Sequence, residues 1–335
     1  MNLWGVPALG ADAQTVTLGD WTFRRLELEE RGMYDAYAAA SDYPITVFSS
    51  NFAYIWGNPG PGSVVLWKEI DGMLALFKYH RRYDTLHLPI LPLGPGSPDH
   101  VAGVLLKAMS FCREWNRSKN TRTRVRVIDD LQYAFLSRSR VFRNYFRCVV
   151  LDGMERHASV RELLTLPGSE FRPVRYALRR FEHEFPEARV RRAEERDRDA
   201  LLELKREWNE SAGAKYTKVW DDVFFNNLLN HAAPLGQSVL VLDVGGTIAA
   251  AGICGISPNG QGWFTWLKYR KRFPGASSVM YIEIAKEVHR LHPDAELINL
   301  GHDAGVSGGL RAFKNKFQPV LDTKRLRVFF RGRYE

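Results

Sequence analysis

The chain has 335 residues, a formal net charge of +9, and 45% hydrophobic residues. Its length suits two domains of about 150 residues each, and its composition excludes a disordered chain. Three cysteines without a C-x-x-C pair exclude a disulfide framework, and we expect no metal site. There is no signal-peptide pattern, and the longest apolar stretch, 238–256, is interrupted by Asp243, Gly245 and Gly246. We therefore expect a soluble, cytoplasmic protein.

In the first half, the pattern predicts a leading helix and then a hairpin around the Asp71-Gly72 turn. Apolar runs and helical periodicity indicate the elements that follow. In chain order, the predicted elements are a helix at 26–40, a hairpin at 63–80, strands at 85–93 and 123–128 on either side of a helix at 98–117, a short helix at 130–137 and a strand at 142–151.

The second half repeats this order about 175 residues later, with weak residue identity. Its hairpin turns at Gly245-Gly246, and amphipathic helices precede it. The predicted elements are helices at 196–209 and 220–231, a hairpin at 238–256, a strand at 263–269, a helix at 276–291, a strand at 296–300, a helix at 309–317 and a strand at 319–330.

A hairpin, a central strand and then helix–strand–helix–strand is the element order of the GNAT acyltransferase fold. We therefore predict an α/β chain of two tandem GNAT-like domains, each a mixed central sheet flanked by helices. The Pro- and Gly-containing stretch 163–173 places the boundary between a domain at 1–165 and a domain at 166–335. The second domain is expected to hold the reaction centre.

Basic residues gather in the segments 111–148, 172–180 and 311–333, of which the first contains Arg124 and Arg126 and the last Arg327. Such clusters favour a polyanion, which could be tRNA, an anionic lipid surface or a phosphorylated substrate. A solvated basic surface without a ligand is the alternative, because charge alone reports electrostatic steering and not function.

The most specific segment is ELINLGHDAGVSGGLRAFKNKFQP, at 296–319. It resembles the late motif of the phosphatidylglycerol lysyltransferase C-terminal-like family, an N-L-G turn followed by a G-L-R-x-[FY]-K-x-K-F-x-P helix. A weaker likeness at 41–56 involves Asp42, Asn51 and Trp56. The chain lacks the transmembrane segments of the membrane-bound members. The matching late residues are Asn299, Leu300, Gly301, Leu310, Arg311, Phe313, Lys314, Lys316, Phe317 and Pro319.

The resemblance implies transfer of an amino acid from aminoacyl-tRNA. Since the donor ester is already activated, the enzyme has to position a nucleophile and stabilise an oxyanion. We expect Lys316 or Lys314 to stabilise the oxyanion, Asp303 or, as an alternative, His302 to accept the proton, and Arg311 to hold a phosphate of the tRNA 3′ end. The alternative is that the lysines are exposed helix residues and Asp303 is a turn or cap residue.

A second segment, YRKRFPGASS at 269–278, lies between a strand and a helix. GNAT enzymes that use coenzyme A have an [RQ]-x-x-G-x-[GA] loop here, whose N–H groups bind pyrophosphate. Arg272 and Gly275 fit this pattern, whereas Ser277 stands at its last position in place of Gly or Ala. Pro274 removes one backbone N–H donor. In a tRNA-dependent enzyme the loop would hold a phosphate of the terminal adenosine. A basic turn with a Ser N-cap is the alternative.

Two further groups are candidates for binding substrates. Arg172, Arg175 and Arg179 follow the expected boundary, where they would contact the tRNA acceptor stem or form a solvated helix face. Aromatic and polar residues could line an acceptor or aminoacyl pocket, although aromatic residues on strands more often belong to a core. The pocket candidates are Tyr216, Trp266, Asn299 and His302, with Trp208 and Trp263 as weaker ones.

The sequence thus predicts an aminoacyl-tRNA-dependent aminoacyltransferase that needs no cofactor, because aminoacyl-tRNA is its donor substrate. The acceptor would be a small-molecule amine or hydroxyl, or a lipid headgroup reached by peripheral contact with a membrane. One alternative is a GNAT N-acyltransferase that uses acetyl-CoA. Another is a non-catalytic module that binds RNA or an anionic membrane.

Overall fold

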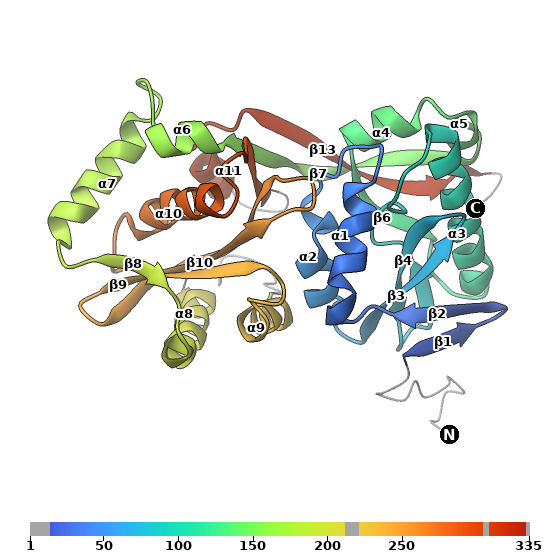
Figure 1. The fold of residues 1–335 in the computed structure, drawn as a ribbon, viewed down its shortest axis with the longest axis horizontal. Coiled ribbons are helices and arrows are strands. Elements are labelled where there is room, and N and C mark those ends of the chain that lie inside the picture. The colour runs from blue at the N-terminus through green and yellow to red at the C-terminus, as the bar shows by residue number, and fades with distance from the viewer. Residues whose placement is uncertain (1–13, 212–220, 304–307, 333–335) are drawn as a thin grey trace. The chain divides into compact units, whose positions relative to one another are not determined.

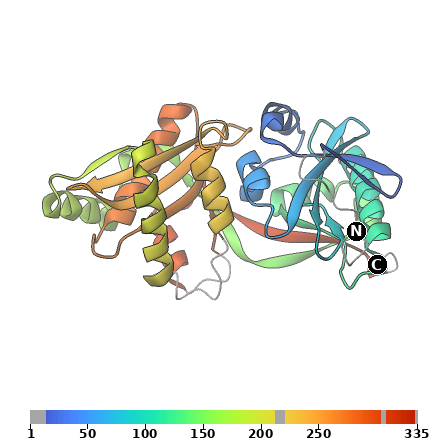
Figure 2. The same ribbon diagram turned by 90° about the horizontal axis from the view of Figure 1, so that it is seen from below.

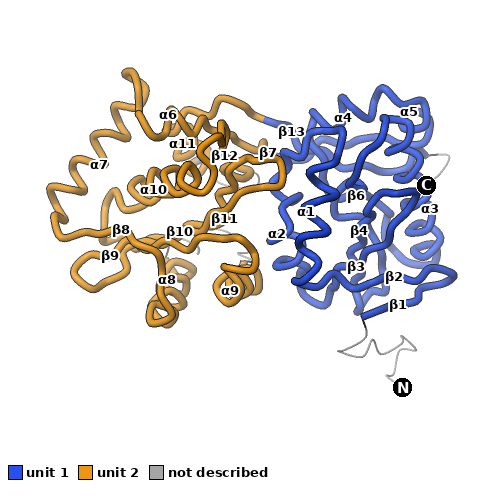
Figure 3. The backbone as a smooth tube through the Cα atoms, viewed as in Figure 1, with its two compact units in different colours: residues 1–152, 323–335 blue, residues 153–322 orange. Residues whose placement is uncertain are grey.

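The computed structural model describes residues 14–211, 221–303 and 308–332, which form two compact units (Figures 1 and 3). Unit 1 comprises Met1–Asp152 and Thr323–Glu335, and unit 2 comprises Gly153–Asp322. Residues 153–165 therefore lie in unit 2 and residues 323–335 in unit 1, whereas a single boundary after residue 165 would place them the other way round.

Unit 1 contains a five-stranded sheet in the order β1-β2-β3-β4-β5. The β3–β4 hairpin turns at Asp71 and Gly72, whose φ values of 50° and 79° are both in the left-handed region that this tight turn requires. The strands are β1 (Thr15–Leu18), β2 (Trp21–Arg25), β3 (Ser63–Ile70), β4 (Met73–His80) and β5 (Thr85–His87).

The helices of unit 1 begin with caps that the sequence supplies. Ser97 accepts a hydrogen bond from the His100 N–H at the start of α3, and Pro98 occupies its first turn, where no N–H partner is required. The predicted leading helix is divided into η1 and α1. The helices are η1 (Leu28–Glu30), α1 (Arg31–Ala39), η2 (Phe48–Ser50), α2 (Phe52–Gly57), α3 (Pro98–Asn116), α4 (Asp130–Leu136) and α5 (Arg140–Tyr145).

The last strand of each half of the sequence completes the other unit. Strand β7 (Phe146–Ser159) pairs with β12 through its 155–159 part, in unit 2. Strand β13 (Leu321–Phe330) pairs through its 325–329 part with β6 (Arg124–Asp129), in unit 1. This strand exchange is the reason why the units differ from a division of the sequence into consecutive halves.

In unit 2, the sheet order is β7-β12-β11-β10-β9-β8. Helix α10 covers one face of the sheet, and α8 and α9 cover the other (Figures 1 and 2). The elements are α6 (Val160–Thr165), α7 (Arg172–Glu184), β8 (Arg189–Arg192), η3 (Glu195–Asp197), α8 (Arg198–Ser211), α9 (Asp222–Asn230), β9 (Gln237–Val244), β10 (Thr247–Ile256), β11 (Gly262–Tyr269), α10 (Ala276–Leu291), β12 (Leu297–His302) and α11 (Gly308–Asn315).

Glycines allow α10 to lie close to the sheet. A Cβ at Gly252 would be 2.5 Å from Cδ1 of Ile284, and one at Gly262 would be 2.6 Å from Cγ1 of Val288. Strand β11 runs parallel to β12, and the other strand pairs of this sheet in unit 2 are antiparallel. Each unit therefore has the α/β architecture of a GNAT-like domain, with helices on a central sheet, which confirms the predicted fold class.

Parallel strands β11 and β12 are in register at Gly262 with Ile298 and at Trp263 with Asn299, near the start of both strands. On its other side β12 pairs antiparallel with β7, from Leu297 opposite Ser159 to His302 opposite Glu155. This position at the carboxyl end of a parallel strand is where ligands of open α/β sheets commonly bind. No helix of the described chain is long and apolar enough to cross a membrane.

Candidate functional site

The end of β12 is fixed by hydrogen bonds of a buried asparagine. Asn299 Oδ1 accepts a hydrogen bond from the Gly301 N–H at 2.7 Å, and its Nδ2 donates to Glu155 Oε2 at 3.0 Å. Gly301 has a φ of 73°, a left-handed conformation in which a residue with a side chain would be strained. The N-L-G sequence is therefore explained by the turn itself, and Asn299, predicted in a substrate pocket, is engaged within the protein.

Lys314 of α11 is buried, with 5% of the residue exposed. Its Nζ donates to the carbonyl oxygens of Leu300, Gly301 and His302 at 2.7, 2.8 and 2.9 Å. An ammonium group has three N–H donors, so these bonds use all of them. In this arrangement Lys314 joins α11 to the end of β12.

Asp303 lies next along the chain, and its side chain is fully buried. Oδ1 accepts a hydrogen bond from the Met154 N–H at 2.9 Å, and Oδ2 accepts bonds from Arg156 Nη2 at 3.1 Å and from Arg311 Nε at 3.0 Å. Burial acts to raise the pKa of Asp303, but the bonds from Met154, Arg311 and Arg156 outweigh it and hold the pKa below its usual value. This carboxyl group is therefore ionised at neutral pH.

Arg311 is the more exposed of the two arginines at Asp303. Its side chain is 55% exposed, against 12% for Arg156, which also contacts Asp322. Asp303 binds Arg311 through Nε, and no described residue binds either of its Nη atoms. An arginine whose Nε is bound to a carboxylate can present its two Nη groups as a planar pair of donors, which suits a phosphate or carboxylate ligand.

Lys316 and His302 are both exposed. Lys316 follows the last residue of α11, and its Nζ lies 5.8 Å from the centre of the Phe313 ring. Beneath the helix, Phe317 stacks on Tyr281 with 3.9 Å between ring centres, and both rings are buried. These aromatic contacts hold α11 against α10 and leave Lys316 on the outside.

The loop before α10 lies against the basic helix α7. Phe273 contacts Phe185 ring to ring at 5.3 Å, and a Cβ at Gly275 would be 3.3 Å from the Ala177 carbonyl oxygen. Gly275 has a φ of 94°, so this position needs glycine for conformation and for space. Arg272 is exposed on this loop.

Three N–H groups of this loop have partners inside it. The N–H of Phe273 donates to Arg270, that of Ala276 to Phe273, and that of Ser278 to Gly275. Pro274 has no N–H. The loop is therefore one amide donor short at position 274, and it has Ser277 where the coenzyme A motif has Gly or Ala.

The three predicted phosphate contacts on α7 have two different environments. Arg172 and Arg179 are exposed and share an outer face with Tyr176, which is 68% exposed. Arg175 is half-buried, and its Nη1 donates to the carbonyl of Leu166 at the end of α6. Arg175 thus has a structural contact of its own, whereas Arg172 and Arg179 are presented to solvent.

On the α8 and α9 side of the sheet, Trp266 belongs to a packed cluster. It stacks on Phe225 with 4.4 Å between ring centres, and its Nε1 donates to Asp221 at 3.2 Å. Lys268 is buried over the Trp208 ring, 3.5 Å from its centre, with its Nζ 3.1 Å from Asp221. Tyr216 lies outside the described residues.

Sequence reasoning missed Arg156 and Lys268. Arg156 lies on β7, far from the motif at 296–319, and only the strand exchange brings it to Asp303. For Lys268 there was a signal, since a lysine in the apolar strand GWFTWLKY has to be buried or paired.

Burial lowers the pKa of Lys268, and the neighbouring Asp221 partly opposes that shift. For Asp221, burial acts to raise the pKa, but Lys268 and Lys205 outweigh it and lower it. The cluster is therefore a compensated set of buried charges.

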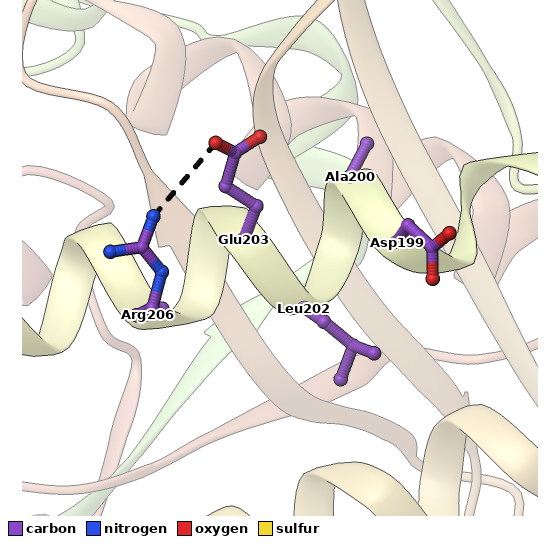
Figure 4. A pocket seen from close by; sticks show the side chains of 5 residues that line it. All are labelled: Asp199, Ala200, Leu202, Glu203 and Arg206. Carbon is purple, nitrogen blue, oxygen red and sulfur yellow. Dashed lines mark ion pairs between the residues drawn. The ribbon is translucent and has the colours of Figure 1, made fainter.

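A shallow pocket lies on the outer surface of α8 (Figure 4). It carries two carboxylates, Asp199 and Glu203, and the Arg206 Nη2 atom lies 3.9 Å from Glu203. Net negative charge makes this pocket unsuited to a phosphate ligand. Within the described residues, no group of His, Cys, Asp and Glu side chains could hold a metal ion.

Comparison with known proteins gives a family match over residues 130–329, to the model described as "Phosphatidylglycerol lysyltransferase, C-terminal". No curated protein sequence matches. Among solved structures, a conserved protein of unknown function from Bacteroides thetaiotaomicron has 19% identity and a TM-score of 0.76, covering 92% of this chain and 99% of that one.

Two further solved structures share the fold. The C-terminal domain of a putative lysylphosphatidylglycerol synthetase from Agrobacterium fabrum has 14% identity and a TM-score of 0.63, covering 92% of this chain and 94% of its own. The L-PGS from Bacillus licheniformis has 15% identity and a TM-score of 0.62, covering 89% and 91%. The family match contains the β12–α11 site described above, which lies within residues 130–329.

Proposed function

The chain belongs to the phosphatidylglycerol lysyltransferase C-terminal family, and on that premise we propose that it is an aminoacyltransferase that uses aminoacyl-tRNA as donor. The observation that carries the proposal is the exposed guanidinium group of Arg311, whose Nε lies 3.0 Å from Asp303 Oδ2. Lys314 stabilises the adjoining turn by donating to its carbonyl oxygens. We propose a small-molecule amine or hydroxyl as acceptor, with a lipid headgroup as the other possibility.

In the proposed reaction, the acceptor nitrogen or oxygen attacks the ester carbonyl carbon and forms the new bond to the amino acid. The bond from that carbon to the tRNA ribose oxygen then breaks, and the acceptor proton replaces the acyl group on the ribose oxygen. Negative charge develops on the carbonyl oxygen in between, so cations fixed near it lower the barrier.

The contacts suggest distinct roles for the motif residues. Arg311 would bind a phosphate of the tRNA 3′ end, and the exposed Lys316 would stand near the carbonyl oxygen. We assign Asp303 to orienting Arg311, because a buried carboxylate with a lowered pKa is a poor proton acceptor. The proton then passes through His302, exposed at the same turn, and Lys314 acts by positioning that turn.

The remaining contacts with tRNA would involve basic side chains of unit 2. Arg172 and Arg179 share the outer face of α7, and Arg272 is exposed on the loop that packs on this helix. Together they offer three exposed cations to the acceptor stem, which is the kind of surface that binds a phosphate backbone.

An acetyl-CoA-dependent N-acyltransferase is the second candidate. The loop at 269–278 weakens it, because Pro274 provides no N–H donor and Ser277 stands where the coenzyme A motif has Gly or Ala. A non-catalytic RNA-binding or membrane-binding module is the third candidate, and it predicts binding without any turnover.

The test is to incubate the purified protein with total radiolabelled aminoacyl-tRNA and a cell extract, with coenzyme A removed. Transfer of label from tRNA to a new product supports the proposal, and the labelled amino acid and product identify the substrates. Acetylation of amines from acetyl-CoA without use of charged tRNA would establish the second candidate instead. Binding of tRNA without either product would favour the third.

A further inference from the structure

Unit 1 has a row of four cations across one face of its strands, which we call the basic stripe: Lys78, Arg124, Arg126 and Arg327. They come from β4, β6 and β13, and two of the three basic segments of the sequence meet here only because β13 pairs with β6. Nothing in the proposed reaction uses these residues, which all belong to unit 1.

Strand register places the four side chains on the same face. Lys78 is opposite His87 of β5, and the bridge between Leu88 and Val125 places His87 beside Arg124. On the other side of β6, Arg124 is opposite Phe329, and Arg327 Nε approaches the carbonyl oxygen of Arg126 at 3.4 Å. The stripe therefore crosses β4, β5, β6 and β13 as one continuous row.

No carboxylate neutralises the stripe within the described part of the chain, where none of the four cations forms an ion pair. Burial, reinforced by Arg126 and Arg124, lowers the pKa of Lys78 to about 8. Burial and the neighbouring arginines also lower the pKa values of Arg124 and Arg327. Like charges that are neighbours on one face repel one another, so this arrangement costs stability unless an anion is bound.

His87, at the centre of the stripe, is 7% exposed, and its Nδ1 is buried without a hydrogen-bond partner. Its Nε2 lies 3.4 Å from Thr121 Oγ1. Burial and then Arg124, Arg126, Lys78 and Arg327 lower the pKa of this imidazole to about 3, so it is neutral. A buried polar atom without a partner is rare in a folded protein, and here it lies among the cations.

We infer that the basic stripe binds the phosphate backbone of a nucleic-acid strand. Neighbouring strands lie about 4.8 Å apart, so the row from β4 to β13 extends roughly 14 Å. A single phosphate would leave part of this row without a counter-charge, whereas consecutive phosphates of a strand would match its length. The identification of this nucleic acid as tRNA rests on the proposed function.

The shape of the site favours a nucleic-acid backbone over a membrane surface. Arg126 is exposed, but Lys78, Arg124 and Arg327 are only partly exposed, and His87 is buried. A Cβ at Gly60 would lie 2.9 Å from Lys78 Nζ, so the loop containing Gly60 stands beside that end of the stripe. A flat bilayer surface reaches recessed charges poorly, whereas a single phosphate backbone can enter between side chains.

The test measures binding of labelled, deacylated tRNA between 50 and 200 mM salt. The variant is Arg124→Gln/Arg126→Gln, and the matched control is Arg82→Gln/Arg140→Gln, which removes two exposed positive charges of unit 1 outside the stripe. Thermal melting of both variants serves as the control that they are folded. Inorganic phosphate and vesicles containing phosphatidylglycerol are measured in parallel.

We expect the stripe variant to bind tRNA more weakly and to lose about 0.7–0.9 of the slope of log affinity against log salt for each cation removed. The fall in affinity between 50 and 200 mM salt would then shrink by roughly tenfold, while the control keeps the wild-type slope. Equal slopes for the stripe variant and the control would overturn the inference. The inference would also be overturned if the stripe variant changed the binding of only phosphate or vesicles and left tRNA binding unchanged.

A transfer assay on the same variants separates this inference from the proposed function. If wild-type protein transfers an amino acid and the stripe variant keeps the same KM for charged tRNA, the inference fails and the proposed function stands. If the stripe determines tRNA binding but no transfer occurs, the inference stands and the proposed function fails.

Discussion

Arg156 on β7 and Asp303 after β12 form a buried ion pair, with 3.1 Å between Nη2 and Oδ2, although 147 positions separate them in the sequence. Arg156→Met should lower the free energy of unfolding by about 3 kcal/mol, because it removes one partner of a buried charge. Urea denaturation measures this change.

Arg311→Met is the matched variant, since Arg311 binds the same carboxylate but is 55% exposed. It should lower stability by less than about 1 kcal/mol. In the transfer assay it should lower kcat/KM for charged tRNA roughly 10- to 100-fold, as expected for a lost charged hydrogen bond. Equal destabilisation by the two variants would contradict the separate roles that we assign to them.

Lys314 and Lys316 should respond differently to the same substitution. Lys314→Met leaves the carbonyls of Leu300, Gly301 and His302 without their donor, and it should destabilise the protein by about 3 kcal/mol. Lys316→Met should change stability by less than about 0.5 kcal/mol but lower kcat roughly 100-fold. Unchanged transfer by the Lys316 variant would remove this lysine from the proposed mechanism.

On α7, exposure predicts which arginines contact tRNA. Arg172→Gln/Arg179→Gln should weaken tRNA binding and reduce its salt dependence by about 0.7–0.9 in log–log slope per residue. Arg175→Gln should instead lower the melting temperature, because Arg175 donates to the Leu166 carbonyl. Filter binding at several salt concentrations, with melting of each variant, distinguishes the two effects.

The lowered pKa of Asp303 makes stability depend on pH in acid. In the unfolded chain an aspartate titrates near about 3.9, and in the folded protein it binds its proton at lower pH. The contribution to stability is therefore complete above about pH 5 and is lost as the pH falls toward the folded-state pKa. In Asp303→Asn, unfolding followed between pH 2 and 6 should lack this component. An identical pH profile would show that the ion pair does not form in solution.

Local patterns predicted much of the fold. The helix at 276–291 has the bounds of α10, and the Asp71-Gly72 and Gly245-Gly246 dipeptides turn the two hairpins. These features depend on neighbouring residues alone. For amphipathic α7 the sequence indicated only a possible solvated face with Arg172, Arg175 and Arg179, because the many charges of its outer face obscured the buried Val174 and Phe181.

The site was less predictable, because sequence identifies residue types but not the partners that occupy them. The motif at 296–319 pointed to Asp303, Arg311 and Lys314, and the structure brings them together. It did not indicate that three carbonyl oxygens would accept hydrogen bonds from Lys314, or that Arg156 would bind Asp303 together with Arg311. Both facts depend on long-range pairing, of β12 with β7 and of α11 with the strand end, which no local pattern encodes.

The strand exchange also determines when each unit can be completed during synthesis. Unit 1 contains Met1–Asp152 but also needs β13, whose Phe330 ring packs on Phe146. A ribosome has to translate all of unit 2 before that strand exists, so β6 keeps an unpaired edge in the nascent chain. Such edges bind other strands readily, and the interval before β13 emerges is when this protein most needs a chaperone.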